Sequence, residues 1–154
     1  MNRFFAVLGF SLLLGSCHSQ KTAVSSSGVR QGVGGYVKER VGNQMPSPDV
    51  PSSDGRAVLT TVYIYELTNL SQVERVGTSS FYTAVNTKLV QTAESDSSGY
   101  FSAQLPQGTY SLFTKVDGKF YANRFDSQNN IAVVTVAENK LTEVNITISA
   151  KASF

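Results

Sequence analysis

The residue types that most often carry out chemistry are scarce in this chain. It contains one cysteine, Cys17, and one histidine, His18, among 154 residues. A single cysteine excludes an intramolecular disulfide framework and a cysteine-rich zinc site. A single histidine excludes the HExxH motif of zinc proteases and a histidine-based catalytic triad. The formal net charge of +2, from 13 basic and 11 acidic side chains, gives no basic footprint for nucleic acid. We therefore expect a protein that is not an enzyme and that holds no metal and no cofactor.

The cysteine follows a segment that is typical of a signal peptide. Arg3 supplies a positive charge, and residues 4–14 form an apolar run that is shorter than the ~20 residues needed to span a bilayer. Residues 1–16 are therefore expected to be cleaved and are excluded from the fold. Residues 14–17, Leu-Gly-Ser-Cys, resemble the lipobox of bacterial lipoprotein signal peptides.

The lipobox resemblance implies a lipid anchor on the protein. In that family, cleavage falls between the residues that correspond to Ser16 and Cys17, a diacylglycerol is attached to the thiol and the new N-terminus is acylated, for example with palmitate. Two or three acyl chains hold a protein on a membrane almost permanently. The alternative is an ordinary secretory leader that ends near a free cysteine.

The residues after Cys17 suggest which membrane and which face. His18 stands where an aspartate would retain an enterobacterial lipoprotein in the inner membrane, so the resemblance favours the outer membrane. Residues 19–24 contain no acid, whereas some surface-exported lipoproteins carry an acidic cluster there. The expected location is the cell envelope, on the periplasmic face rather than the cell surface.

Composition divides the rest of the chain into a tether, one domain and a tail. Residues 17–32 are rich in Ser, Gly and Gln and lack hydrophobic periodicity, which is typical of a flexible linker. Residues 33–149 form the predicted domain, and residues 150–154 the tail.

Within that domain, short runs of β-branched and aromatic residues alternate with turn-forming clusters, the pattern of an all-β protein. The predicted fold is a seven- to eight-stranded antiparallel two-sheet sandwich. Two long polar connections, at 42–55 and 68–80, interrupt it, and three prolines in the first exclude a central strand there. The expected strands are residues 33–41, 57–67, 81–92, 100–104, 109–116, 119–125, 131–137 and 141–149.

The clearest hairpin is centred on Asp117-Gly118, because both central residues of a type I′ turn need a positive φ. Alternation of side chains along the strands then divides the residues between the two faces of each sheet. The expected core residues are Tyr110, Leu112, Val116, Tyr121, Phe125, Val144, Ile146 and Ile148. The second strand carries Val58, Val62 and Ile64 on one face and Leu59, Tyr63 and Tyr65 on the other.

Two motifs resemble the carboxypeptidase regulatory-like domain. They are Ser-Asp-Ser-Ser-Gly-Tyr-Phe at 95–101 and Leu-Pro-Gln-Gly-Thr-Tyr-Ser-Leu at 105–112. The resemblance covers roughly residues 32–149 and implies a transthyretin-like (prealbumin-like) β-sandwich. Transthyretin-related hydrolases need histidines in the domain and a C-terminal Tyr-Arg-Gly-Ser, which this sequence lacks. The resemblance therefore implies an accessory module.

Clustered oxygen ligands leave a calcium site open as an alternative. Glu94 and Asp96 share one turn, and Asp117, Asp126 and residues 129–130 supply further carboxylate and amide oxygens. None of these groups has the spacing of an EF-hand, and ordinary turn chemistry accounts for them.

An intramolecular isopeptide bond, as in adhesins of Gram-positive bacteria, is a second alternative. Lys38, Asn145 and a nearby acid, Glu66 or Glu94, supply the required groups. The reaction needs a buried site, however, and Asn145 faces outward in the expected register.

The candidate binding residues are aromatic side chains on the outer face of the predicted hairpin and the basic residues near them. They are Phe113, Phe120, Tyr82, Lys115 and Arg124. An exposed patch of this kind could bind a glycan or peptide. The alternative is that these rings are buried, either under residues 81–92 or against the second sheet.

The sequence as a whole indicates a lipid-anchored, non-catalytic envelope protein that serves as a protein-, peptide- or glycan-binding or assembly module. One alternative is a pilus or adhesin accessory subunit that pairs through an edge strand. A small hydrolase is a third. The membrane, through the lipid on Cys17, and another envelope component are the expected partners.

Overall fold

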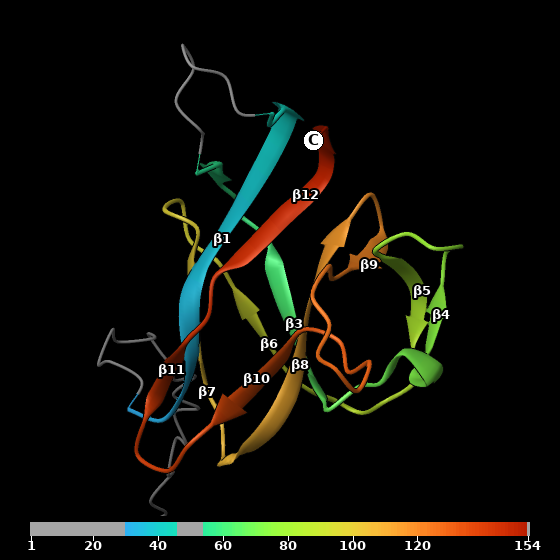
Figure 1. The fold of residues 1–154 in the computed structure, drawn as a ribbon. Coiled ribbons are helices and arrows are strands. Elements are labelled where there is room, and N and C mark those ends of the chain that lie inside the picture. Colours follow the sequence, from blue (N-terminus) through green and yellow to red (C-terminus); the bar gives the residue numbers. More distant parts are fainter. Residues whose placement is uncertain (1–29, 46–53, 154) are drawn as a thin grey trace, which may run out of the picture.

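The computed structural model describes residues 30–45 and 54–153. The signal peptide, Cys17 and most of the tether, together with the proline-rich part of the first long connection, lie outside the described residues. The described part is almost entirely β-structure, with one short 3-10 helix, η1 (Leu70–Gln72). Its strands form two sheets that pack face to face (Figure 1), which confirms the predicted all-β sandwich.

The first sheet is built around a single long strand, β1 (Gly32–Asn43). Along one edge it pairs in parallel with β11 (Leu141–Glu143) and then with β12 (Ile146–Ser153). The register is the same from Gly32↔Leu141 to Glu39↔Ile148 and shifts by one residue before Val41↔Lys151. It also pairs antiparallel with β7 (Tyr100–Gln104) and β2 (Arg56–Ala57). The expectation of a purely antiparallel sandwich is therefore wrong for β1 and its C-terminal partners, which run side by side in Figure 1.

A close backbone approach interrupts the last strand between β11 and β12. A Cβ atom on Gly35 would lie 1.9 Å from the carbonyl oxygen of Val144, so a side chain at this position would clash with the crossing chain. The Val144 N–H donates to the Gly34 carbonyl at 2.9 Å. The missing side chain of Gly35 thus allows the C-terminal segment to cross β1 closely.

The second sheet contains seven strands in the order β4-β5-β9-β8-β3-β6, with β10 paired to β8. The Asp117-Gly118 turn joins β8 to β9, and φ values of 49° and 77° at these residues confirm the type I′ prediction. The strands are β3 (Thr61–Glu66), β4 (Val73–Arg75), β5 (Phe81–Val85), β6 (Leu89–Glu94), β8 (Gly108–Val116), β9 (Lys119–Tyr121) and β10 (Val133–Val136).

The main core lies between the two sheets and is mostly aliphatic. Leu112 of β8 is buried in it, as predicted, and of the two faces of β3 the one that carries Val62 and Ile64 is turned toward it. Val58, Val116, Val144 and Ile146 pack against it and are partly buried. Its buried members are Val33, Val37, Val62, Ile64, Ala93, Phe101, Ala103, Leu105, Tyr110, Leu112, Tyr121, Val134, Val136 and Ile148.

A second core lies on the outer face of the second sheet and is rich in aromatic rings. Its buried members are Tyr65, Tyr82, Phe113, Ala122 and Ile131. The β4–β5 hairpin, η1 and the 122–132 segment contribute residues to it, and in Figure 1 the β4–β5 hairpin stands well away from β1. The elongated connection at 68–80 therefore helps to form a core instead of a free loop.

Several strand boundaries differ from the sequence expectation. Phe125 was expected in the core, but β9 ends at Tyr121 and Phe125 is 41% exposed, with the Arg75 guanidinium 5.6 Å from its ring centroid. The 81–92 segment divides into β5 and β6, which pair with different strands. Residues 150–153, expected to be tail, extend β12 beside the end of β1.

Candidate functional site

The structure does not bring the five candidate binding residues together on one surface. Phe113 and Tyr82 are both fully buried. Their rings are 5.8 Å apart in an edge-to-face arrangement, and the Tyr82 hydroxyl donates to the Ala122 carbonyl at 3.3 Å. The exposed-patch interpretation is wrong for these two residues, because residues of η1, β4 and the 122–132 segment pack around them. The alternative interpretation, that these rings are buried, is the correct one for Phe113 and Tyr82.

Lys115 and Phe120 remain at the surface, directly opposite each other on β8 and β9. The Lys115 ammonium lies 4.8 Å from the centroid of the half-buried Phe120 ring and 5.0 Å from that of Tyr63. These distances are typical of cation–π contacts. The Phe120 and Tyr63 rings already contact the Lys115 ammonium, so these three side chains interact with one another and give no sign of a ligand site.

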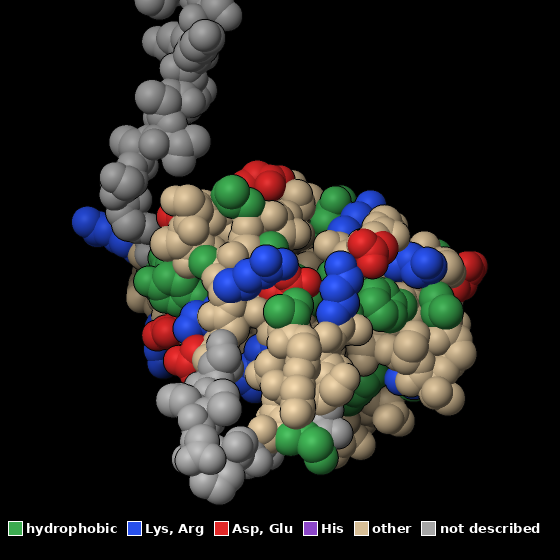
Figure 2. Space-filling model, turned by 90° about the horizontal axis from the view of Figure 1, so that it is seen from above, with side chains coloured by type: hydrophobic (Ala, Val, Ile, Leu, Met, Phe, Trp, Pro, Cys, Tyr) green, Lys and Arg blue, Asp and Glu red, His purple; other side chains and the backbone are tan. Residues whose placement is uncertain are grey.

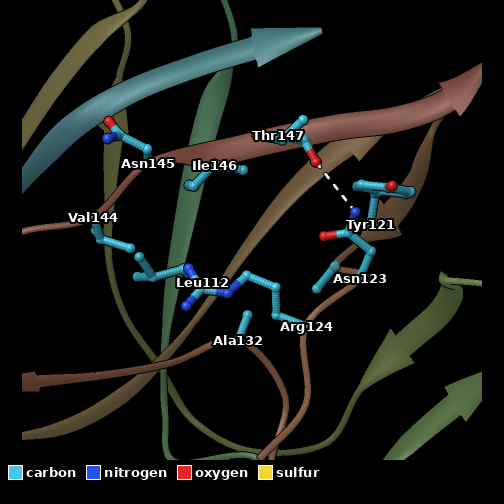
Figure 3. Close-up of a pocket in the computed structure, with 10 residues that line it drawn as sticks. Leu112, Tyr121, Asn123, Arg124, Ala132, Val144, Asn145, Ile146 and Thr147 are labelled. Carbon is cyan, nitrogen blue, oxygen red and sulfur yellow. Dashed lines mark hydrogen bonds between the residues drawn. The ribbon is translucent and has the colours of Figure 1, made fainter. Parts of the chain in front are cut away.

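Arg124 lies elsewhere, at a narrow opening between the sheets (Figure 3). The opening is lined by residues of the 122–124 and 144–147 segments, and the Asn123 amide donates across it to the Thr147 carbonyl at 3.3 Å. Its cavity volume is about 20 Å³, which is room for one water molecule. Arg124 therefore borders a gap that is too small for a sugar or peptide side chain.

A larger concave surface lies on the outer face of the first sheet. Gly34 faces outward on β1, between Ser102 of β7 and Glu143 of β11. Because Gly34 has no side chain, a trough runs along β1 at this point. A Cβ atom there would lie 3.1 Å from the Tyr100 hydroxyl and 3.5 Å from a Leu141 methyl group, so both side chains lean over the glycine.

Two tyrosines form the end and one wall of this trough. Tyr36 and Tyr100 are directly opposite each other on β1 and β7, with ring centroids 5.4 Å apart and ring planes at 62°. Tyr36 is 41% exposed and Tyr100 is partly exposed. The cavity has a volume of about 350 Å³ and is lined by Gly34, Gly35, Tyr36, Tyr100, Leu141 and Glu143, a size within the range of small-molecule sites.

Polar groups surround the aromatic pair. The exposed Glu143 carboxylate lines the trough opposite the tyrosine wall, and Ser102 lies across Gly34 from it. The Asn145 side-chain oxygen accepts from the Tyr36 N–H at 3.0 Å and fixes the chain where the trough ends. The site combines apolar ring surface with a hydrogen-bond acceptor and a hydroxyl, but no basic side chain lines it.

Sequence reasoning missed this site although a signal for it was present. Val33 and Val37 are fully buried, so the alternate residues of β1, including Gly34 and Tyr36, must face outward. The same alternation places Tyr100 outside and Phe101 inside on β7. What the sequence could not supply was the pairing that puts the two tyrosines side by side.

The carboxylates of the two acidic turns accept hydrogen bonds within their own turns and thereby stabilise them. The Asp96 carboxylate accepts from the Ser98 hydroxyl at 2.6 Å and from two backbone N–H groups, and these bonds lower its pKa. Asp126 accepts from the Asn130 side chain and from the Gln128 and Asn130 N–H groups, which likewise lowers its pKa. Within residues 30–45 and 54–153, no three His, Cys, Asp or Glu side chains gather as metal ligands would.

The proposed isopeptide partners are not assembled either. Lys38 lies 3.9 Å from Asp54 at the surface, while Asn145 is exposed and bonded to the Tyr36 backbone. Glu94 accepts from the Thr61 hydroxyl at 2.8 Å on the far edge of the second sheet.

The molecular surface carries charges of both signs. On the face seen in Figure 2, Lys and Arg side chains lie among Asp and Glu side chains and hydrophobic residues, so this face presents no single-signed patch. Across the part of the chain that the structure describes, we find no helix with the length and apolar character needed to cross a membrane.

Comparisons with known proteins give one structural similarity. No protein family's sequence profile matches the chain, and no curated protein is similar to it. The structure is similar to the crystal structure of a Pseudomonas aeruginosa protein suggested to bind carbohydrate, with 16% sequence identity and a TM-score of 0.41. The match covers 77% of this chain and 90% of that one. A similarity at this level carries no argument about ligand or mechanism.

Proposed function

We propose that this protein is a non-catalytic glycan-binding module of the cell envelope, and that the trough on the outer face of β1, β7 and β11 holds the sugar. The observation that carries the proposal is the exposed Tyr36–Tyr100 pair, with rings 5.4 Å apart, next to the Glu143 carboxylate in a cavity of about 350 Å³. Unlike Phe113 and Tyr82, these rings are accessible.

The chemistry of the trough matches that of a pyranose ring. A sugar presents an apolar face of C–H groups and an edge of hydroxyl groups. Tyrosine offers a large, rigid and amphipathic surface for the first. Glu143 can accept hydrogen bonds from hydroxyls, and bonds to a carboxylate are stronger than those to neutral acceptors. The missing side chain at Gly34 leaves room for the Tyr100 hydroxyl and a Leu141 methyl group to lie over β1, and these two groups form the floor of the trough.

A glycan array followed by titration tests this function. The full chain would be applied to the array, and binding to any hit would be followed by fluorescence, which reports on tyrosine because the chain has 7 Tyr and no Trp. The test variants are Tyr36→Ala, Tyr100→Ala and Glu143→Gln. Phe125→Ala is the matched control, since Phe125 is also 41% exposed but lies on the other sheet's side of the molecule.

We expect Tyr36→Ala and Tyr100→Ala each to weaken binding about tenfold, the equivalent of roughly 1.4 kcal/mol of aromatic contact. Phe125→Ala should bind as the unmodified chain does. The proposal fails if no glycan binds, or if the trough variants bind as well as the control. A peptide ligand that depends on Tyr36 would keep the trough as the site and overturn the glycan assignment.

We also propose that Cys17 anchors the protein to the membrane through lipid, with the outer membrane as the site. The support is the Leu-Gly-Ser-Cys sequence at 14–17 after an apolar run. Metabolic labelling with a clickable palmitate analogue should mark the full chain, and Cys17→Ser should remove the label. Protease treatment of intact and lysed cells would then distinguish the periplasmic from the surface face.

A further inference from the structure

The trough on the first sheet carries one charge, and that charge is negative. Glu143 is the only residue lining it that is charged at neutral pH. The register of β11 turns this side chain outward, because Thr142 is paired with the buried Val33 and Glu143 with the outward-facing Gly34. The Glu143 carboxylate is therefore presented to whatever group occupies the trough.

The Glu143 carboxylate has no partner in the part of the chain that the structure describes. Within residues 30–45 and 54–153 it takes part in no ion pair and accepts no hydrogen bond. Lys38, the next outward residue of β1 after Tyr36, already lies 3.9 Å from the Asp54 carboxylate. A positive charge opposite Glu143 would therefore have to come from the ligand.

The aromatic rings of the trough favour a ligand of the same sign. The face of a tyrosine ring has negative electrostatic potential and attracts cations. Glu143 is paired with Gly34, two residues before Tyr36. For neighbouring strands about 4.8 Å apart that rise about 3.3 Å per residue, the Cα atoms of Glu143 and Tyr36 are roughly 8 Å apart. One compact ligand group above Gly34 can therefore contact both the ring and the carboxylate.

We infer that the ligand of the trough is an amino sugar, whose ammonium group pairs with Glu143 while the apolar face of its ring lies against Tyr36 and Tyr100. This inference rests on the proposed glycan-binding function and narrows it to one class of sugar. In a hexosamine the ammonium is attached directly to the ring, so one rigid group supplies both the charge and the apolar face.

Two other classes of ligand fit the trough less well. An acidic sugar would place its carboxylate near Glu143, and no basic side chain lines the trough to offset that repulsion. A lysine side chain carries the required charge, but it has no flat apolar face and loses more rotamer freedom when it is held in place.

Four probes test the inference on the full chain. Three are oligosaccharides with the same β-1,4-linked glucose backbone, which carry an amino, an acetamido or a hydroxyl group at C2. The fourth is the peptide trilysine. Tyrosine fluorescence would follow each titration at a mildly acidic pH, at which amines are protonated and carboxylates are ionised.

Glu143→Gln removes the charge and keeps the shape of the side chain. We expect the unmodified chain to bind the amino oligosaccharide about three- to tenfold more tightly than the hydroxyl one, as for an exposed charge-assisted contact. Glu143→Gln should abolish this preference and change the binding of the hydroxyl oligosaccharide less. Comparing two ligands with two side chains in this way isolates the contact between them.

Glu66→Gln is the matched control. Glu66 is also exposed, but it lies on β3 in the second sheet, and the same substitution changes the net charge equally. This variant should keep the full preference for the amino oligosaccharide. Loss of the preference in both variants would mean that net charge, and not a contact at Glu143, attracts the ligand, and it would overturn the inference.

The remaining outcomes separate this inference from the proposed function. Equal binding of the three oligosaccharides, or a preference for the acetamido one, would overturn the amino-sugar assignment. The glycan-binding function would still stand if Tyr36→Ala weakened that binding. Tighter, Glu143-dependent binding of trilysine would assign the trough to a basic peptide and overturn both. If the amino oligosaccharide does not bind, the inference fails, and the glycan array decides the function.

Discussion

Both sheets of this protein carry aromatic side chains on their outer faces, but those of the second sheet are buried and those of the first sheet are exposed. On the second sheet, Phe113 and Tyr82 are fully buried, because the β4–β5 hairpin and the 122–132 segment cover them. On the first sheet, nothing in the described chain covers Tyr36, which stays 41% exposed. Aromatic residues on a sheet therefore mark a core or a binding surface according to what is packed above them.

The largest expected difference between the two faces is in stability. Phe113→Ala should lower the free energy of unfolding by about 3–5 kcal/mol, because it leaves a cavity among packed rings. Tyr36→Ala should change it by less than about 1 kcal/mol, as for most exposed residues. Urea unfolding followed by circular dichroism measures both. Similar losses for the two variants would contradict the distinction between a covered and an open face.

A smaller effect on stability is expected at Thr114, which follows Phe113 on β8 and points to the opposite face of the sheet. Thr114 is fully buried, and its hydroxyl has no hydrogen-bond partner among the described residues. Thr114→Val keeps the shape and removes this unpaired group, so it should stabilise the fold by about 1 kcal/mol. The exposed Thr92 supplies the control: Thr92→Val should change the stability by less than half a kcal/mol or so. A destabilised Thr114→Val variant would mean that the hydroxyl does have a partner.

The covered face should also make stability depend on alkaline pH. Burial raises the pKa of Tyr65 and Tyr82 above the ordinary value of 10.0. Above pH 10 the unfolded chain therefore loses these protons before the folded chain does, and the stabilisation falls as the pH rises further. Unfolding measured between pH 9 and pH 11, roughly one unit on each side of that value, should show this loss. Tyr82→Phe should make the loss smaller.

The smallest effect is expected from the two acidic turns. The Ser98 hydroxyl bonded to Asp96, and the Asn130 side chain bonded to Asp126, lower the pKa of these carboxyls below 3.8. Their contribution to stability is present above that value and is lost as the pH falls through the lowered pKa. Asp96→Asn should therefore flatten the acid limb of the stability curve slightly. An unchanged acid limb would mean that the carboxylate bonds are replaced by water at no cost.

Much of the local structure followed from the sequence. The positive φ values required at Asp117-Gly118 predicted the β8–β9 hairpin, and alternation predicted the inward positions of Leu112 and Ile148. Strand lengths were less predictable. The strand expected at 141–149 is interrupted where the chain crosses β1 at Gly35, and the strand expected at 81–92 is divided because β5 pairs with β9 and β6 pairs with β3. Both breaks depend on segments that are distant in sequence.

The candidate site was the part that sequence reasoning placed incorrectly. Alternation assigned Phe113 and Phe120 to an outer face correctly, but it could not show that η1, β4 and the 122–132 segment pack against that face. Tyr36 and Tyr100 are 64 positions apart in the sequence, and they meet because β1 and β7 are paired. No local pattern contains that pairing.

The sequence alone determined what depends on neighbouring residues: the all-β class, the turn at Asp117-Gly118 and the alternation of side chains along the strands, while lipid attachment at Cys17 stays a prediction. These follow from side-chain period, backbone steric preference and a short motif. The tertiary structure decided which outward face is covered and which tyrosines meet over Gly34. Burial and proximity are set by the packing of distant segments, and the energy of that packing is spread over the whole fold.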